Sequence, residues 1–155
     1  TDEIYNSVGN LVYKGEMKNG KRHGKGVQYC DDSELVLYEG EFKDGYYDGE
    51  GILYYYGGGL LCNGIMYYTY YKGTFCKGLM HGRIEQYSIN HDNYNSPINI
   101  TNYKMGKRHG LYKTFITQDD TARYMNAKGH YEDNIEHGTY TTYHPNGTVA
   151  EGRAA

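Results

Sequence analysis

The sequence predicts an all-β protein, folded as a single-layer, twisted antiparallel sheet of about five to six consecutive β-hairpins. A motif of Tyr-x-Gly-x-(aromatic or Met)-x-x-Gly, with a further glycine four residues later, recurs along the chain. Apolar and polar residues alternate within it, which is the pattern of half-buried strands. Glycine and tyrosine number 22 and 21 among 155 residues, and this composition suits a thin sheet better than a thick core.

The repeat organises residues 1–155 as one array. Copies start near residues 13, 38, 71, 99 and 127, and a partial copy starts near 150. With the first residue of each copy counted as zero, position eleven is always glycine and position sixteen is always aromatic. The glycines are Gly24, Gly49, Gly82, Gly110 and Gly138, and the aromatic residues are Tyr29, Tyr54, Tyr87, Phe115 and Tyr143. Repeats of roughly 20–50 residues indicate stacked copies of one supersecondary unit.

Each copy is predicted to form one hairpin. Tyr38, Gly40 and Phe42 lie on one face of a strand, and the glycine leaves room for a ring from the neighbouring unit. Positions seven to eleven are expected to form a loop of about four or five residues, because dipeptides such as Asp44-Gly45, at positions six and seven, supply turn chemistry. The longest connection, between Tyr55 and Tyr70, predicts a lengthened hairpin or loop.

The motif resembles the MORN (membrane occupation and recognition nexus) repeat. The fullest copy is YEGEFKDGYYDGEG at residues 38–51, and residues 13–26 are nearly as full. The copies that start at Asn99 and Ala127 resemble a variant form, with Tyr112 and Tyr140 at position thirteen. The resemblance implies a sheet of successive hairpins with a groove along one face, often in a dimer. It implies no single activity, because such arrays occur in scaffolds, junctional membrane proteins, lipid kinases and lysine methyltransferases.

Charge and cysteine usage narrow the class of partner. The net charge is −3 and the isoelectric point is near 6.1, so the chain lacks the basic field that nucleic-acid binding needs. Cys30, Cys62 and Cys76 are odd in number and widely spaced, which favours reduced thiols and a cytoplasmic location, with peripheral membrane attachment as the variant. No apolar run has the roughly 18 residues that a membrane helix needs.

Catalytic and metal-binding patterns are not evident. Position ten holds His23, His81, His109 and His137. Copies two strands apart would place them about 10 Å from one another, whereas ligands to one zinc ion lie within about 4 Å. The histidines are therefore expected to order the turns, and no metal or cofactor is predicted. No serine lies in a Gly-x-Ser-x-Gly elbow, so the chain is predicted not to be an enzyme and no catalytic residue is assigned.

A surplus of tyrosine supplies the candidate binding residues. Seven tyrosines outside the repeat positions cluster in one part of the sequence: Tyr46, Tyr47, Tyr55, Tyr56, Tyr67, Tyr68 and Tyr70. They either pack the long connection against the sheet or form an aromatic patch that binds a partner. Tyrosine is enriched at the centres of protein interfaces, because it offers a large amphipathic surface at low entropic cost.

The leading interpretation is a non-enzymatic scaffold or interaction module that binds a protein or peptide through an aromatic groove or an edge strand, with a homodimer as one form. A peripheral membrane or phosphoinositide-binding adaptor is the alternative, because the turns 21–23 and 107–109 are basic and would meet anionic lipid. A second alternative is the repeat arm of a larger enzyme, such as a SET-type lysine methyltransferase, because the sixth copy is truncated. The variant-form copies also allow a toxin-neutralising or viral host-interaction protein.

Overall fold

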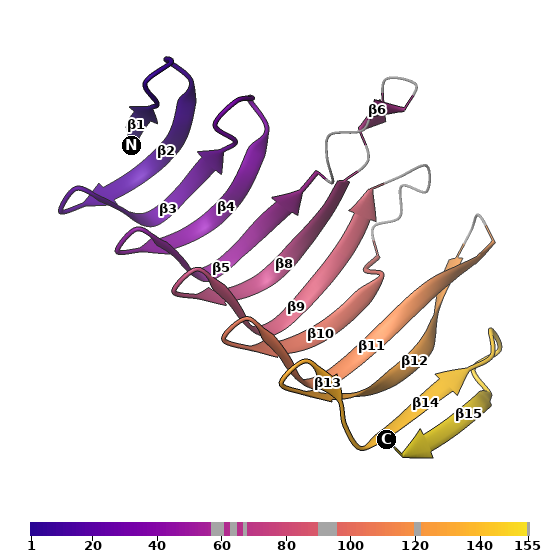
Figure 1. Ribbon diagram of the computed structural model, residues 1–155. Coiled ribbons are helices and arrows are strands. Elements are labelled where there is room, and N and C mark those ends of the chain that lie inside the picture. Colours follow the sequence, from indigo (N-terminus) through magenta and orange to yellow (C-terminus); the bar gives the residue numbers. More distant parts are fainter. Residues whose placement is uncertain (57–60, 63–64, 67, 90–95, 120–121, 155) are drawn as a thin grey trace.

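The computed structural model describes residues 1–56, 61–62, 65–66, 68–89, 96–119 and 122–154. These residues form strands and turns, with no helix among them, so none of the described segments is a helix that could cross a membrane. Thirteen strands make one antiparallel sheet, in the order β1-β2-β3-β4-β5-β8-β9-β10-β11-β12-β14-β15, with β13 paired to β12. Figure 1 shows the sheet as one curved layer with the termini at opposite ends. The predicted fold class is confirmed.

The strand bounds follow the repeat. The main sheet contains β1 (Asp2–Tyr5), β2 (Leu11–Lys18), β3 (Lys21–Tyr29), β4 (Val36–Lys43), β5 (Tyr46–Tyr55), β8 (Tyr68–Cys76), β9 (Leu79–Ile89), β10 (Asn99–Lys104), β11 (Lys107–Asp119), β12 (Ala122–Glu132), β13 (Ile135–Glu136), β14 (Thr139–Tyr143) and β15 (Val149–Ala154). The long connection carries a separate two-stranded ladder of β6 (Leu61–Cys62) and β7 (Ile65–Met66). β1 lies before the first copy and was not predicted.

The hairpin turns are tighter than the sequence suggested. In the second copy, β4 ends at Lys43 and β5 begins at Tyr46, so only Asp44 and Gly45 form the turn. Both have positive φ, at 50° and 88°, as a two-residue type I′ turn requires. The expected loop over positions seven to eleven is therefore wrong. In the first four copies the glycine at position eleven lies within the second strand, beside a register shift, and Gly49 has a φ of 102°.

Neighbouring copies are joined turn to turn by one repeated hydrogen bond. The backbone N–H at position seven donates to the carbonyl at position nine of the preceding copy, at 2.8–3.0 Å in all four junctions. The pairs are Gly45 with Arg22, Gly78 with Tyr47, Gly106 with Met80 and Asn134 with Arg108. Each junction therefore has the same spacing, which fixes how one hairpin is placed on the next.

One face of the sheet, here called the ring face, holds the core. Tyr13 and Tyr38 are completely buried, and Phe42 and Phe75 are each 3% exposed. Phe42 packs edge-on against both tyrosines, at centroid distances of 5.3 and 5.1 Å. Tyr38 also packs edge-on against Phe75 at 5.4 Å. Edge-to-face contacts of this kind stabilise beyond area burial alone, so the rings link three copies into one cluster.

Glycines make the space for these rings. A Cβ atom on Gly51 would collide with the Tyr38 phenol, and a Cβ atom on Gly26 would collide with that of Tyr13. In these copies the ring and the glycine beneath it belong to the same hairpin, so the expected ring from a neighbouring unit is wrong here. It is correct further along the chain, where Tyr112 of the fourth copy lies over Gly129 of the fifth.

Candidate binding face

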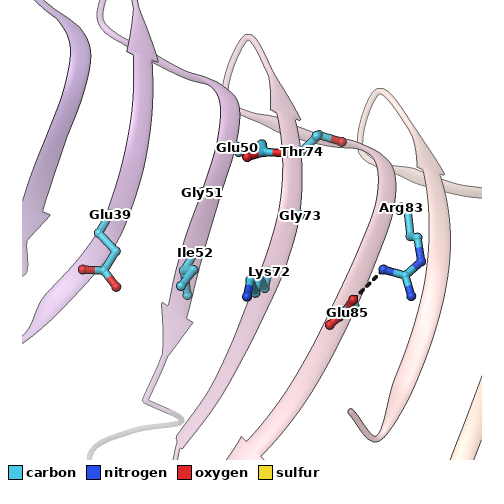
Figure 2. A pocket seen from close by; sticks show the side chains of 9 residues that line it. All are labelled: Glu39, Glu50, Gly51, Ile52, Lys72, Gly73, Thr74, Arg83 and Glu85. Carbon is cyan, nitrogen blue, oxygen red and sulfur yellow. Dashed lines mark hydrogen bonds and ion pairs between the residues drawn. The ribbon is translucent and has the colours of Figure 1, made fainter. Parts of the chain in front are cut away.

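The opposite face, here called the groove face, carries an aligned row of side chains. The pairing registers place Glu39 opposite Ile52, Ile52 opposite Lys72, and Lys72 opposite Glu85, across β4, β5, β8 and β9. These residues line a groove of about 620 Å³ whose floor includes the backbone of Gly51 and Gly73. Figure 2 shows the row crossing four strands. A second groove of about 580 Å³ continues toward β3 and shares Glu39 and Glu50 with the first.

Five tyrosine rings gather on the same face, beyond the groove, and are called here the tyrosine cluster: Tyr54, Tyr56, Tyr68, Tyr70 and Tyr87. Alternation places them there, because each of Tyr54, Tyr70 and Tyr87 lies two residues from a member of the groove row. Tyr70 and Tyr87 are directly opposite in the ladder and stack at 4.7 Å with an interplanar angle of 10°. The other ring pairs lie at 5.5–6.5 Å.

The cluster is tied to the groove by its hydroxyl groups. Tyr54 Oη donates to Glu39 Oε1 at 2.9 Å, and Tyr87 Oη donates to Glu85 Oε2. Tyr56 Oη donates to the carbonyl of Val36 at 2.6 Å. Burial and these carboxylates raise the pKa of Tyr87 to about 12 and that of Tyr54 further above its usual value. Because three of the five rings are held by hydroxyl bonds, the cluster is a preformed surface.

Glu85 is held in its charged form at the end of the row. The hydrogen bond from Tyr87 lowers the pKa of Glu85 most, burial opposes this, and Arg83 lowers it further. Arg83 Nη1 lies 2.5 Å from Glu85 Oε1, and the arginine side chain is 59% exposed. The groove therefore presents fixed negative charge between aromatic rings and an exposed cation.

The structure divides the seven tyrosines that the sequence grouped. Tyr56, Tyr68 and Tyr70 lie in the tyrosine cluster. Tyr47 lies on the ring face, stacked on Tyr38 at 3.9 Å, and Tyr46 lies beside the turn of the third copy, 56% exposed. Tyr55 points to the opposite face from its two neighbours and is 64% exposed. Tyr67 lies outside the described residues.

Two members of the cluster were missed from the sequence. Tyr54 and Tyr87 occupy position sixteen and were counted as residues of the repeat. The signal that finds them is alternation: Tyr54 and Tyr56 share a face, and Tyr87 is two residues from Glu85. In this part of the chain, the aromatic residue at position sixteen of the repeat therefore also belongs to the tyrosine cluster on the groove face.

Two of the four histidines at position ten, His81 and His109, contact the neighbouring turn. His81 Nδ1 accepts a hydrogen bond from the backbone N–H of Met105 at 3.1 Å, and His109 Nδ1 accepts one from Asp133 at 3.5 Å. Asp48 makes the equivalent bond to Lys77 N at 3.2 Å. This supports the role in turn order inferred from the sequence for His81 and His109, whereas His23 Nδ1 has no hydrogen-bond partner within the described part of the chain and His137 lies beside Glu132 of its own hairpin. Among the residues described, no three His, Cys, Asp or Glu side chains gather in a metal-binding group.

The arginines of the two basic turns make contacts within the protein. Arg22 lies over the Tyr13 ring at 5.0 Å, and its Nη1 donates to Gln28 Oε1 at 3.4 Å. Arg108 lies over the Tyr131 ring at 4.3 Å and donates to the carbonyl of Asn134 at 3.1 Å. In cation–π packing of this kind, the arginine charge interacts with a ring of the protein itself. Less of each turn's charge is therefore directed outward.

These features define a class of protein: an open, single-layer array of β-hairpins that packs rings on one face and presents an aromatic and charged groove on the other. Within that class, the model of the MORN repeat family matches residues 13–34 and 38–60, so these two segments are MORN repeats. MORN repeats are generally modules that interact with proteins or membranes, and the fold is typically non-catalytic. No curated protein matches the chain.

Proposed function

We propose that the protein is a non-enzymatic interaction module that binds a partner protein through the groove face, with the tyrosine cluster at the centre of the contact. The proposal rests on one observation above all: five rings gather on the face that does not hold the core. Aromatic side chains at the centre of a contact dominate binding energy, and the polar groups around them set orientation.

The charges beside the cluster support a protein partner. Glu39, Glu50 and Glu85 lie in one groove with Lys72 and Arg83, so both signs of charge are present within it. A partner that matches this pattern gains specificity and a faster encounter. Binding to an anionic lipid surface is favoured instead by a patch of positive charge alone. The two basic turns contribute less to such a patch, because their arginines pack against rings within the protein.

Site-specific crosslinking tests the proposal. A photoreactive phenylalanine analogue replaces Tyr70 in one variant and Tyr55 in a second, since Tyr55 is exposed on the opposite face and makes a matched control. After irradiation of the protein in its native lysate, we expect a defined protein adduct from position 70 and none from position 55. The adduct should disappear when Tyr87→Ala is added, because Tyr87 stacks on residue 70.

Equal adducts at both positions, or an adduct that survives Tyr87→Ala in a folded protein, would remove the assignment to this face. Co-sedimentation with anionic vesicles provides the second arm. Salt-sensitive binding there that is lost on Lys21→Glu and Lys107→Glu, and unaffected by Tyr70→Ala, would favour the lipid adaptor instead.

A further inference from the structure

The groove face is complementary to itself. We propose that two copies of the chain pair groove face to groove face, about a two-fold axis parallel to the strands and midway between β8 and β9. The inference rests on the proposed function, because it names the partner of the same face. The inference is drawn from the order of charged residues along the aligned row. The pairing registers show that this row extends across the whole sheet.

The row continues beyond the groove without a break. Its members are Glu3, Lys14, Val27, Glu39, Ile52, Lys72, Glu85, Ile100, Lys113, Lys128, Thr141 and Gly152, each directly opposite the next in the ladder. One residue comes from each strand along the main path. β8 and β9 are the sixth and seventh of these twelve strands, so the proposed axis passes through the middle of the sheet.

Rotation about that axis places opposite charges together. Glu39 on β4 faces Lys113 of the partner subunit, because β4 and β11 lie equally far from the axis. Lys72 faces Glu85 of the partner subunit in the same way. Ile52 faces Ile100 of the partner subunit between the two ion pairs. Each contact occurs twice, as an isologous interface requires.

The adjoining rows contain no like-charge clash under the same rotation. On the turn side, the paired residues are Thr74 with Arg83, Glu50 with Asn102, and Glu41 with Leu111. On the other side, the stacked pair of Tyr70 and Tyr87 lies beside the axis and meets its own symmetry copy. A two-fold axis perpendicular to the strands instead sets Glu39 against Glu39 and Lys113 against Lys113. Of these two arrangements, the charge order therefore favours the one with the axis parallel to the strands.

An anomaly within the chain supports the same arrangement. Lys113 and Lys128 are directly opposite on neighbouring strands, and both are exposed. Like charges directly opposite in a ladder are destabilising. Lys128 gains a contact with the Tyr143 ring, at 6.0 Å. A carboxylate from a second copy, at Glu39 of the partner subunit, places a negative charge against this pair and offsets the repulsion.

The area is sufficient for a dimer. The six strands from β4 to β11 span about 24 Å at about 4.8 Å spacing, and strands of eight or nine residues are about 30 Å long. The product, about 700 Å² on each copy, is near the roughly 800 Å² that each partner buries in a stable interface. The central six residues of the row fall within this area.

Charge reversal tests the pairing by sedimentation equilibrium across a protein concentration series. We expect a reversible dimer for the unmodified chain. Glu39→Lys and Lys113→Glu should each weaken dimerisation by more than about tenfold, because each sets like charges together twice. Glu34→Lys, the same charge change at an exposed position in the turn before β4, is the control and should leave dimerisation unchanged.

Mixing gives the sharper result. An equimolar mixture of the Glu39→Lys and Lys113→Glu variants should form a heterodimer, because residue 39 and residue 113 then carry opposite charges at both contacts. The double variant should recover the homodimer for the same reason. Circular dichroism before mixing confirms that each variant is folded.

A chain that stays monomeric at all concentrations overturns the inference, and so does a mixture of the two variants that stays monomeric. A crosslinked adduct of position 70 with an unrelated protein, from a monomeric chain, overturns the dimer while leaving the proposed function in place. If dimerisation is unchanged in both charge-reversal variants, the contact lies on another face and the proposed arrangement is overturned.

Discussion

The first two copies and the fourth solve the same packing problem from opposite strands. In the first two, a tyrosine on the first strand of the hairpin lies over a glycine on the second, as Tyr38 lies over Gly51. In the fourth copy the first residue is Asn99, and the ring comes from Tyr112 on the second strand, over Gly129 of the next hairpin. The comparison teaches that the unit of packing is a ring over a glycine, whichever strand supplies the ring.

The exchange has a structural cost. Tyr13 and Tyr38 are completely buried, whereas Tyr112 is 6% exposed. A cavity of about 130 Å³ lies next to Asn99, lined by Thr101, Tyr103, Arg108 and other residues. Polar cavities of this size hold water rather than side chains. The last copies are therefore expected to be the less stable part of the array, although the turn-to-turn hydrogen bonds are unchanged.

Removal of a ring should give the largest difference between the two regions. Tyr38→Ala is expected to cost about 3–5 kcal/mol, as for other fully buried aromatic residues. Tyr112→Ala should cost less, because its ring is less enclosed and its site adjoins a cavity that can admit water. Urea denaturation of both variants measures the two values. Equal losses would contradict the idea that the regions differ in packing.

Filling the glycine position should give a graded series. Gly51→Ala is expected to cost about 1–3 kcal/mol, because its Cβ would collide with the Tyr38 phenol. Gly129→Ala should cost less, since the nearest Tyr112 ring atoms are 2.8–3.0 Å from the new Cβ. Gly152→Ala is the control, because its nearest neighbours are 3.9 Å away and its φ is not positive. Thermal unfolding of the three variants should rank them in this order.

Alkaline pH should destabilise the fold, to an extent set mostly by the first three copies. Burial raises the pKa of Tyr56 and of Tyr87 to about 12 each, and that of Tyr38 further. A raised pKa in the folded state means that the stabilisation is complete below about pH 10, the usual tyrosine value, and is lost as pH rises toward 12. Tyrosinate absorbance and circular dichroism, followed together, should show ionisation coupled to unfolding. Full ionisation near pH 10 with the fold intact would contradict this.

The sequence predicted the fold because five copies of one motif determine the order of the hairpins. It misplaced the turn because the glycine at position eleven, such as Gly49, has a positive φ within a strand, and such a bulge is indistinguishable from a loop in sequence. It did not find β1, since residues 2–5 match no copy.

The candidate site was predicted only in part. Tyr56, Tyr68 and Tyr70 were identified as surplus tyrosines, but sequence proximity also grouped Tyr46 and Tyr55 with them. Tyr46 begins β5, about nine residues from its far end, and Tyr55 points to the other face. The charge order along the groove face required the pairing registers, because its members are far apart in the chain. Such rows emerge only once the strands are aligned.

The most direct test of the binding face is nuclear magnetic resonance of protein with isotope-labelled tyrosine rings. Spectra are recorded as the complex forms, either by raising the protein concentration or by adding the protein captured at position 70. We predict that the ring signals of Tyr54, Tyr70 and Tyr87 shift, while those of Tyr47 and Tyr55, on the ring face, do not. Shifts confined to Tyr47 and Tyr55, with the tyrosine cluster unchanged in a formed complex, would contradict the assignment of binding to the groove face.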